Sequence, residues 1–284
     1  MSGISRLFPD VKLRRGIRCL MRRESERARR PIPGSCKTSF PGENGREKGV
    51  FLNRRPIITI DGPAGAGKST ISKLLASRLS FICLDTGALY RAVAYRLKCE
   101  GWNGAAGTIA DSGRLLKVSL KHEAGRVRVI VDGEDVSEKI RTEEIGLLAS
   151  RVSALPQIRE NLLPVQRELA AAGGVVAEGR DMGTVVFPDA DVKFFLDASL
   201  EERAKRRYLE MVCKGERVNL TDIENDLLLR DRQDRRRSIA PLVIPAEAVI
   251  VDSSNQSIPQ VVDFMISVIE RVCPLRECFL PEFT

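Results

Sequence analysis

The segment Ile57 to Thr70 reads IITIDGPAGAGKST and spaces glycines, a lysine and a hydroxyl as G-x-x-x-x-G-K-[ST]. Glycines let the backbone approach a phosphate chain and point successive N–H groups at it. Lys68 is expected to reach the outer phosphates, and the Ser69 hydroxyl to bind Mg²⁺ directly or through water. A helix starting near Lys68 would add its positive end. The predicted nucleoside triphosphate loop comprises Gly62, Pro63, Ala64, Gly65, Ala66, Gly67, Lys68, Ser69 and Thr70.

A second cluster, LDTGALYR, follows an apolar run and opens a helical pattern. This order places Thr86, Tyr90 and Arg91 near the carboxyl edge of a sheet, where ligands bind in open α/β folds. The alternative is an ordinary strand-to-helix turn in which Asp85 caps the helix. The cluster alone does not decide between the two.

A third cluster places Glu178, Arg180 and Asp181 directly after the buried run VV. Charges at the end of a buried strand are costly unless they pair or act on a ligand. The residues therefore predict either a ligand site or a structural salt bridge.

A fourth cluster, LLLRDRQDRRRS, carries Arg230, Asp234 and Arg237 on an expected helix. Offsets of four and three put these side chains on one face, so a carboxylate lies between two guanidiniums that can clamp phosphate or sugar. A solvated, salt-bridged helix is the ordinary alternative. That alternative is weakened because other charged residues are expected on the solvated faces, namely Asp231, Arg232, Arg235 and Arg236.

The elements that must position these clusters alternate between buried strand and amphipathic helix from Pro56 onward, as in a doubly wound α/β protein. Strands are expected at 56–61, 81–84, 175–177, 192–196 and 248–251. Helices are expected at about 68–79, 87–99, 143–153, 156–172, 199–213, 221–237 and 258–272. Residues 115–136 instead show two alternating runs and a DG turn, which predict a small antiparallel sheet inserted in the core.

Positive charge is concentrated at the start of the chain. Residues 1–55 carry a net charge of +10, whereas the remainder carries −2. The folded body is therefore not expected to bind nucleic acid. Residues 1–53 lack apolar periodicity and predict a disordered basic leader or a misplaced start codon. A transit peptide or a nucleic-acid-binding arm is a less favoured alternative.

Composition excludes several kinds of chemistry. The single histidine, His122, rules out two-histidine metal sites, and the seven cysteines contain no C-x-x-C pair. No apolar run is long enough for a membrane span, and the first residues lack a signal-peptide pattern, so a cytoplasmic protein without a membrane partner is expected. Phosphoryl transfer suits such a chain because Mg²⁺, lysine and arginine supply most of what it needs.

From residue 56 to 272 the chain resembles bacterial cytidylate kinases. The resemblance is carried by IDGPAGAGKST, LDTGALYRAVA, DGEDVSEKIRTEEIGLLASRVSALPQIRENLLPVQR, EGRDMGTVVFPDADVKFFLDASLEERAKRR and RDRQDRRRSIAPL. It implies an α/β fold with a P-loop NTPase-type parallel sheet flanked by helices. Residues 54–284 would form one kinase domain, with a nucleoside-monophosphate-binding insert at about 100–160 and a lid at about 203–218. Arg203, Arg206 and Arg207 fall in that lid, with no role assigned.

The resemblance also implies roles for the other clusters. Ser150, Arg159 and Asp181 would recognise cytosine, and Arg230 and Asp234 would hold the ribose. The acceptor phosphate would be bound by Arg91, Arg180 and Arg237, with Thr86 and Tyr90 close to the nucleotide. Lys68, Arg180 and Arg237 are the residues expected to act in catalysis.

The expected reaction is transfer of the ATP γ-phosphoryl group to CMP or dCMP with Mg²⁺, by a protein that the resemblance predicts to be monomeric. The alternatives are another nucleoside monophosphate kinase acting on UMP or AMP, a P-loop switch without enzymatic activity, or a nucleic-acid-binding protein that works through its leader. A GTPase switch would be expected to carry an N-K-x-D motif, which the sequence lacks.

Overall fold

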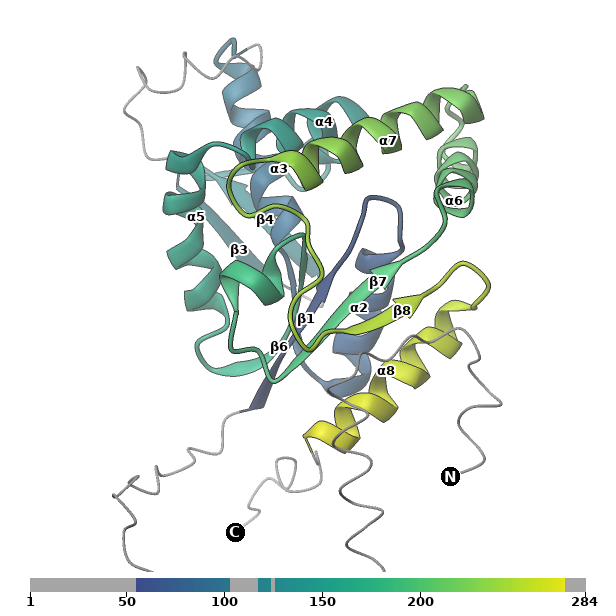
Figure 1. Ribbon diagram of the computed structural model, residues 1–284. Helices are drawn as coiled ribbons and strands as arrows, with labels where there is room; N and C mark the ends of the chain where they lie inside the picture. The colour runs from purple at the N-terminus through teal and green to yellow at the C-terminus, as the bar shows by residue number, and fades with distance from the viewer. Residues whose placement is uncertain (1–54, 103–116, 124–125, 274–284) are drawn as a thin grey trace, which may run out of the picture.

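The protein is described by a computed structural model in which residues 55–102, 117–123 and 126–273 are placed (Figure 1). The predicted leader, residues 1–53, lies outside these residues. All five predicted strands and all seven predicted helices form, with ends that differ from expectation by at most three residues.

The central sheet contains five parallel strands in the order β2-β6-β1-β7-β8. In chain order, the strands are β1 (Arg55–Asp61), β2 (Ile82–Asp85), β6 (Gly173–Gly179), β7 (Val192–Asp197) and β8 (Val249–Asp252). β6 is buried throughout and β1 nearly so, as expected for central strands covered on both faces. The phosphate loop, which follows β1, and the segment of Arg180 and Asp181, which follows β6, therefore start side by side.

Helices cover both faces of this sheet. On one face α2 (Lys68–Leu79) and α8 (Ile258–Val272) pack against apolar side chains of β1, β7 and β8. On the other face α5 (Pro156–Leu169) packs near β2 and β6, together with a π-helix, Met182–Val186, that was not predicted. This layering is the predicted doubly wound α/β architecture (Figure 1).

The predicted antiparallel insert follows α3 (Thr86–Cys99). Its three strands, β3 (Val118–Glu123), β4 (Arg126–Val131) and β5 (Glu134–Asp135), have the order β3-β4-β5. A short 3-10 helix, Lys139–Arg141, leads to α4 (Glu143–Val152), and these elements share a second apolar core with α3. His122 belongs to β3, and its side chain is outside the described part of the protein.

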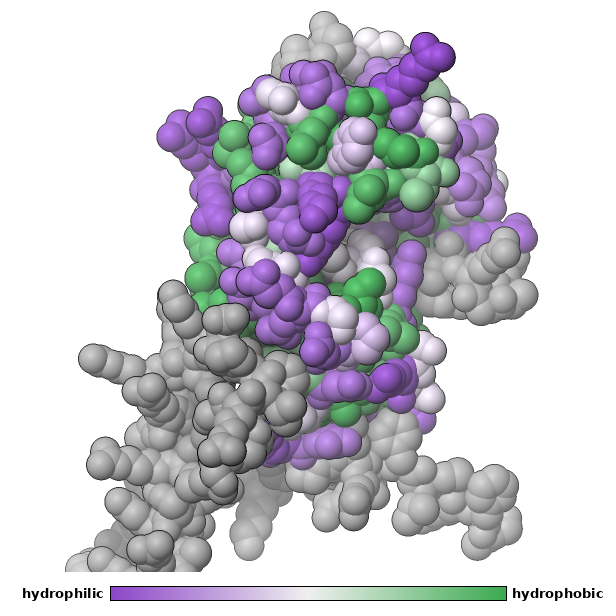
Figure 2. All heavy atoms as spheres, turned by 90° about the vertical axis from the view of Figure 1, so that its right-hand side faces the viewer, coloured by the Kyte–Doolittle hydropathy of each residue, from purple (hydrophilic) through white to green (hydrophobic). Residues whose placement is uncertain are grey.

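The remaining helices, α6 (Leu200–Cys213) and α7 (Leu220–Arg236), pack against each other. α7 crosses above the sheet and contacts α4, which closes one side of the region above the strand ends (Figure 1). On the face that carries α6, charged and apolar side chains are interspersed, and the exposed apolar ones include Leu209 and Val212 (Figure 2). No helix within the described ranges is long and apolar enough to span a membrane.

Candidate active site

A cleft of about 1290 Å³ lies at the carboxyl ends of the strands. The phosphate loop reaches it from β1, Thr86 follows β2, and Arg180 follows β6. α4 and α7 form its opposite wall. The cleft brings together most of the residues singled out in the sequence: Ala64 to Thr70, Thr86, Tyr90, Arg91, Ser150, Arg180, Asp181, Arg230, Asp234 and Arg237. Gly62, Pro63 and Arg159 do not line it.

Gly62 and Pro63 lie at the start of the phosphate loop, outside the lining of the cleft. A Cβ atom at Gly62, which has φ of 153°, would lie 1.9 Å from the Leu196 carbonyl oxygen, so the chain can pass this close to β7 only with glycine. The Pro63 carbonyl accepts a hydrogen bond of 2.6 Å from Lys68 Nζ. Burial, followed by the charge of Arg180, lowers the pKa of Lys68. The ammonium group is therefore held at the loop, where the nearby carboxylates of Glu178, Asp234 and Asp61 only partly offset the cost of its burial.

Ser69 lies opposite Glu178, the buried residue next to the end of β6. Its Oγ donates to Glu178 Oε2 at 2.9 Å, whereas the buried Oε1 has no hydrogen-bond partner among the described residues. Burial, then the charge of Asp85, raises the pKa of Glu178. An unpaired buried carboxylate oxygen beside a phosphate loop is the kind of group that a divalent cation or a donor from a ligand would satisfy.

The second cluster lies at the start of α3. Asp85 does cap this helix, since its carboxylate accepts from the Ala88 N–H at 3.0 Å. The capping does not exclude a ligand site, because Thr86, Tyr90 and Arg91 also line the cleft. Thr86 Oγ1 donates to the Glu178 carbonyl at 2.7 Å and so ties α3 to β6. Burial lowers the pKa of Arg91, which a bound anion would reverse.

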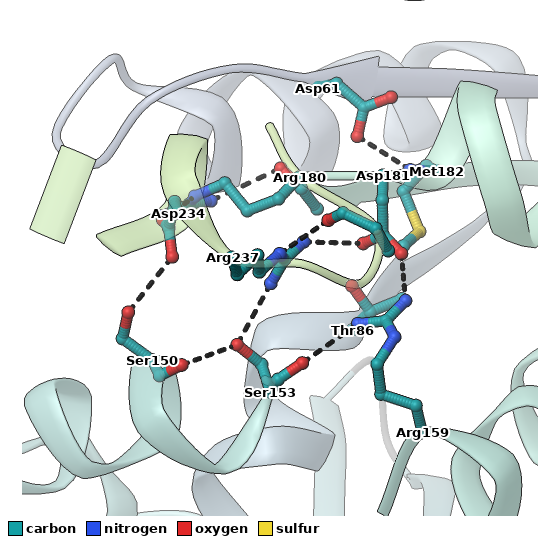
Figure 3. A network of polar contacts seen from close by, with 12 residues as sticks. Asp61, Thr86, Ser150, Ser153, Arg159, Arg180, Asp181, Met182, Asp234 and Arg237 are labelled. Atoms are coloured by element: carbon teal, nitrogen blue, oxygen red, sulfur yellow. Dashed lines mark hydrogen bonds and ion pairs between the residues drawn. The ribbon is translucent and has the colours of Figure 1, made fainter. Parts of the chain in front are cut away.

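Asp181 joins Arg159 of α5 to Arg237, the residue that follows α7 (Figure 3). Its Oδ2 forms a very short ion pair with Arg159, and its Oδ1 lies 3.5 Å from Arg237 NH2. Arg159 also donates to the Ser153 carbonyl at 3.2 Å, and its guanidinium carbon lies 5.8 Å from the centre of the Tyr90 ring. Arg159 is thus behind Asp181, from where it can orient the carboxylate.

Asp234 joins α7 to α4 and β6. Its Oδ1 accepts from Ser150 Oγ at 3.0 Å and its Oδ2 from Arg180 Nε at 2.8 Å (Figure 3). Although burial opposes ionisation, Arg180 holds the pKa of Asp234 below its usual range. The ion pair anticipated as an alternative for Arg180 therefore exists, and it lies within the cleft.

Arg230 is held by Glu143, the first residue of α4, at 3.2 Å. Burial, then the neighbouring Arg180 and Arg91, lowers the pKa of Arg230 to about 10. Its guanidinium rests on Gly146, where a Cβ atom would lie only 2.6 Å from Arg230 NH2. Several guanidiniums are therefore crowded together in the cleft, at an electrostatic cost that a bound phosphate would offset.

The three arginines of the expected lid have different surroundings. Arg203 is buried and anchors the phosphate loop, because it donates to the Ala64 carbonyl at 2.9 Å and pairs with Asp231 at 2.8 Å. Arg206 binds Ser253 Oγ at 3.0 Å. Arg207 pairs with Glu143 across the cleft. The expectation that Asp231 lies on a solvated face is wrong, because that residue is buried and paired with Arg203.

Sequence reasoning did not single out Asp61 or Glu143. The buried Asp61 carboxylate accepts from the Met182 and Gly183 N–H groups, and Glu143 pairs with Arg207 and Arg230. Asp61 ends a buried apolar strand, so the rule applied to Glu178 could have found it. Glu143 gave no comparable signal, because it is one of two adjacent glutamates at the start of a helix, where acidic residues are common.

A sequence model described as cytidylate kinase matches residues 58–271. A cytidylate kinase of Citrifermentans bemidjiense is 49% identical over 80% of this chain and 95% of the relative. One of Geobacter sulfurreducens is 49% identical over 77% of this chain and 95% of the relative. Among solved structures, a shikimate kinase from Acinetobacter baumannii covers 78% of this chain and 94% of its own at 17% identity, but its TM-score of 0.37 supports no conclusion. The family match and the high coverage of these relatives show that the chain belongs to the cytidylate kinase family.

Proposed function

We propose that the protein transfers the γ-phosphoryl group of ATP to CMP or dCMP, which gives ADP and the nucleoside diphosphate. The observation that carries this proposal is the single cleft that contains both the phosphate loop and the clusters at Thr86, Arg180 and Asp234. A switch protein needs only the first of these. Two nucleotides with adjacent phosphates would use all of them.

On the donor side, Gly65 to Thr70 would bind the ATP phosphates through backbone N–H groups, and Lys68 would bind the outer phosphates. The ammonium is already fixed by the Pro63 carbonyl, so little reorganisation is needed when the anion arrives. Arg203 keeps the loop in place from behind through the Ala64 carbonyl.

Magnesium fits this side of the cleft. Within the described ranges no group of three or more His, Cys, Asp or Glu residues could hold a metal ion by itself. Mg²⁺ commonly binds through one or two protein oxygens plus substrate phosphates, and Ser69 with the unpaired Oε1 of Glu178 offers such a set. When bound there, the ion would neutralise charge that develops on the phosphates.

On the acceptor side, Asp181 and Ser150 would contact the cytosine, and Arg159 would orient Asp181 from behind. Asp234 and Arg230 would hold the ribose, since they come from the helix that faces α4. Arg91, Arg180 and Arg237 would bind the phosphate. All of these residues except Arg159 line the cleft, which supports the assignment.

The chemistry needs no general base. A phosphate monoester has a second pKa of about 6, so the attacking oxygen is largely ionised at neutral pH. The protein must bring two polyanions together in line and neutralise the charge spread over the transferred group. Lys68, Arg180 and Arg237, which all line the cleft, would perform that task. Movement of the segment 203–218 over the cleft would exclude water, which otherwise competes with CMP for the phosphoryl group.

The experiment is an ADP-release assay with the full chain, ATP and Mg²⁺, against CMP, dCMP, UMP, AMP and GMP. The proposal requires CMP or dCMP to give the highest kcat/KM. A preference for UMP or AMP would assign a different monophosphate kinase, and ATP binding without turnover of any acceptor would favour a switch. Monomeric state and cytoplasmic location stay predictions.

A further inference from the structure

Asp61 is a fully buried carboxylate that the reaction described above does not use. It is the last residue of β1, and both of its oxygens are engaged by backbone amides. The Met182 N–H donates to Oδ1 at 2.8 Å (Figure 3). The Gly183 N–H donates to Oδ2 at 2.8 Å. Hydrogen bonds from backbone N–H groups to a carboxylate are among the stronger ones in proteins.

The backbone of the same residue is attached to β6. In the parallel register Asp61 lies opposite Gly179. Gly179 therefore lies beside the Asp61 backbone. From Gly179 the chain continues through Arg180 and Asp181 to Met182, whose N–H binds the Asp61 carboxylate. Arg180 and Asp181, which face the acceptor side of the cleft, are thus bracketed by two attachments to one residue.

Asp61 is also joined covalently to the donor side. It directly precedes Gly62, the first residue of the phosphate loop, where the nearby Leu196 carbonyl leaves no room for a side chain. Asp61 is thus linked to the phosphate loop by its peptide bond and to the segment that contains Arg180 and Asp181 by its side chain.

We propose that Asp61 is a positioning residue that fixes Arg180 and Asp181 relative to the phosphate loop, so that the two bound phosphates meet at a constant separation. This inference rests on the proposed function, because it assigns Arg180 and Asp181 to the acceptor nucleotide. Asp61 does not line the cleft and acts through the backbone that it holds.

The cost of burying the Asp61 charge supports a role for this residue in positioning the segment that it binds. Burial raises the pKa of Asp61 to about 6, against the opposing effect of the Gly183 and Met182 hydrogen bonds, while Asp181 raises it and Lys68 lowers it. The carboxylate is therefore kept ionised at neutral pH at a cost in desolvation. Such a cost is consistent with a carboxylate that is kept for the position of its two N–H donors.

The test is Asp61→Asn in the full chain. Asparagine keeps one acceptor oxygen but turns an NH₂ group toward a backbone N–H, so one attachment is lost. Because small misplacements of substrate-binding groups are costly in catalysis, kcat/KM for CMP should fall by about 10- to 100-fold. The dissociation constant of ATP measured without CMP should stay within about twofold, since Arg203 still holds the phosphate loop through the Ala64 carbonyl.

The matched control is Asp191→Asn. The Asp191 carboxylate also accepts a backbone N–H, from Ile57 at 2.7 Å, but at the opposite end of β1 and away from the cleft. Its kinetics should equal those of the wild type. A second comparison uses Asp61→Asn in an Asp181→Asn background, where the further loss should be less than about twofold if Asp61 acts through that segment.

Equal losses of ATP and CMP affinity in Asp61→Asn, or full additivity with Asp181→Asn, would overturn the inference. A wild type that lacks CMP-dependent turnover would sink the proposed function instead. If circular dichroism shows that Asp61→Asn does not fold, hydrogen exchange in the ligand-free wild type decides. The Met182 and Gly183 amides must then exchange as slowly as those of β6, and rapid exchange would refute the attachment.

Discussion

Replacement of Gly146 by alanine should raise stability while weakening the acceptor site. Gly146 lies inside α4, where alanine is favoured over glycine by about 0.5–1 kcal/mol. The new methyl group would lie 2.6 Å from Arg230 NH2, so the guanidinium must move by about 0.8 Å to reach an ordinary contact of 3.4 Å. The backbone is not obstructed, because the atom that must yield is the end of a flexible side chain.

Arg230 is the residue assigned to the ribose, so its displacement should appear in the acceptor constants. A shift of about 1 Å in a positioning group can cost ~100-fold, and we expect KM for CMP to rise by about 10- to 100-fold. That range corresponds to about 1.4–2.7 kcal/mol of lost binding. KM for ATP should stay unchanged, and the thermal midpoint should stay equal or rise.

The assay measures initial rates against CMP at saturating ATP, then against ATP at saturating CMP, with thermal unfolding on the same samples. The matched background is Arg230→Ala, in which Gly146→Ala has no guanidinium to displace and should add no further loss. A folded Gly146→Ala protein with KM for CMP within about twofold of wild type would refute the reasoning, as would an equal loss in both backgrounds.

Three further outcomes are expected. Lys68→Ala should lower kcat by orders of magnitude with the fold intact in circular dichroism, whereas Arg78→Ala, an exposed site on the same helix, should match the wild type; normal turnover without Lys68 would contradict its assignment. Arg159→Ala and Asp181→Ala should reduce the ratio of kcat/KM for CMP over UMP, and an unchanged ratio would remove them from base recognition. Glu178→Gln should make the ligand-free protein more stable at neutral and higher pH, while kcat falls. The pKa of Glu178 is raised, so the folded state holds a proton that the unfolded state has released, and wild-type stability falls as pH rises from about 4.3 to the raised value. Unfolding by urea across that pH range should show this slope in the wild type and a weaker one in Glu178→Gln.

Local patterns were enough to predict the fold. The strand, glycine loop and helix from Ile57 to Leu79 form where the periodicity indicated, and the antiparallel insert forms where the alternation changes. These features depend on residues near one another in the sequence, so one stretch contains the required information. The π-helix Met182–Val186 was missed because no common sequence signal marks this rare element.

The site was only partly predictable, because local patterns do not show which distant residues come into contact. Most of the predicted residues line one cleft, but the contacts that orient them join distant segments. Asp61 and Met182 are 121 residues apart, and Ser69 and Glu178 are 109 apart. Asp231 was misplaced because a helical charge run does not reveal which of its members meets a buried partner such as Arg203. Pairings of this kind follow from the packing of helices on the sheet.

The carboxylates that hold Arg180, Arg230 and Arg237 have a consequence for simple salts. Each guanidinium already has an intramolecular counterion, at 2.8, 3.2 and 3.5 Å respectively. A tethered counterion acts at an effective concentration of the order of millimolar or more, so free sulfate or inorganic phosphate competes poorly with it. A nucleotide adds contacts from its base and sugar to those of its phosphate, so the tethered carboxylates would favour a whole nucleotide over a simple oxyanion at these three arginines.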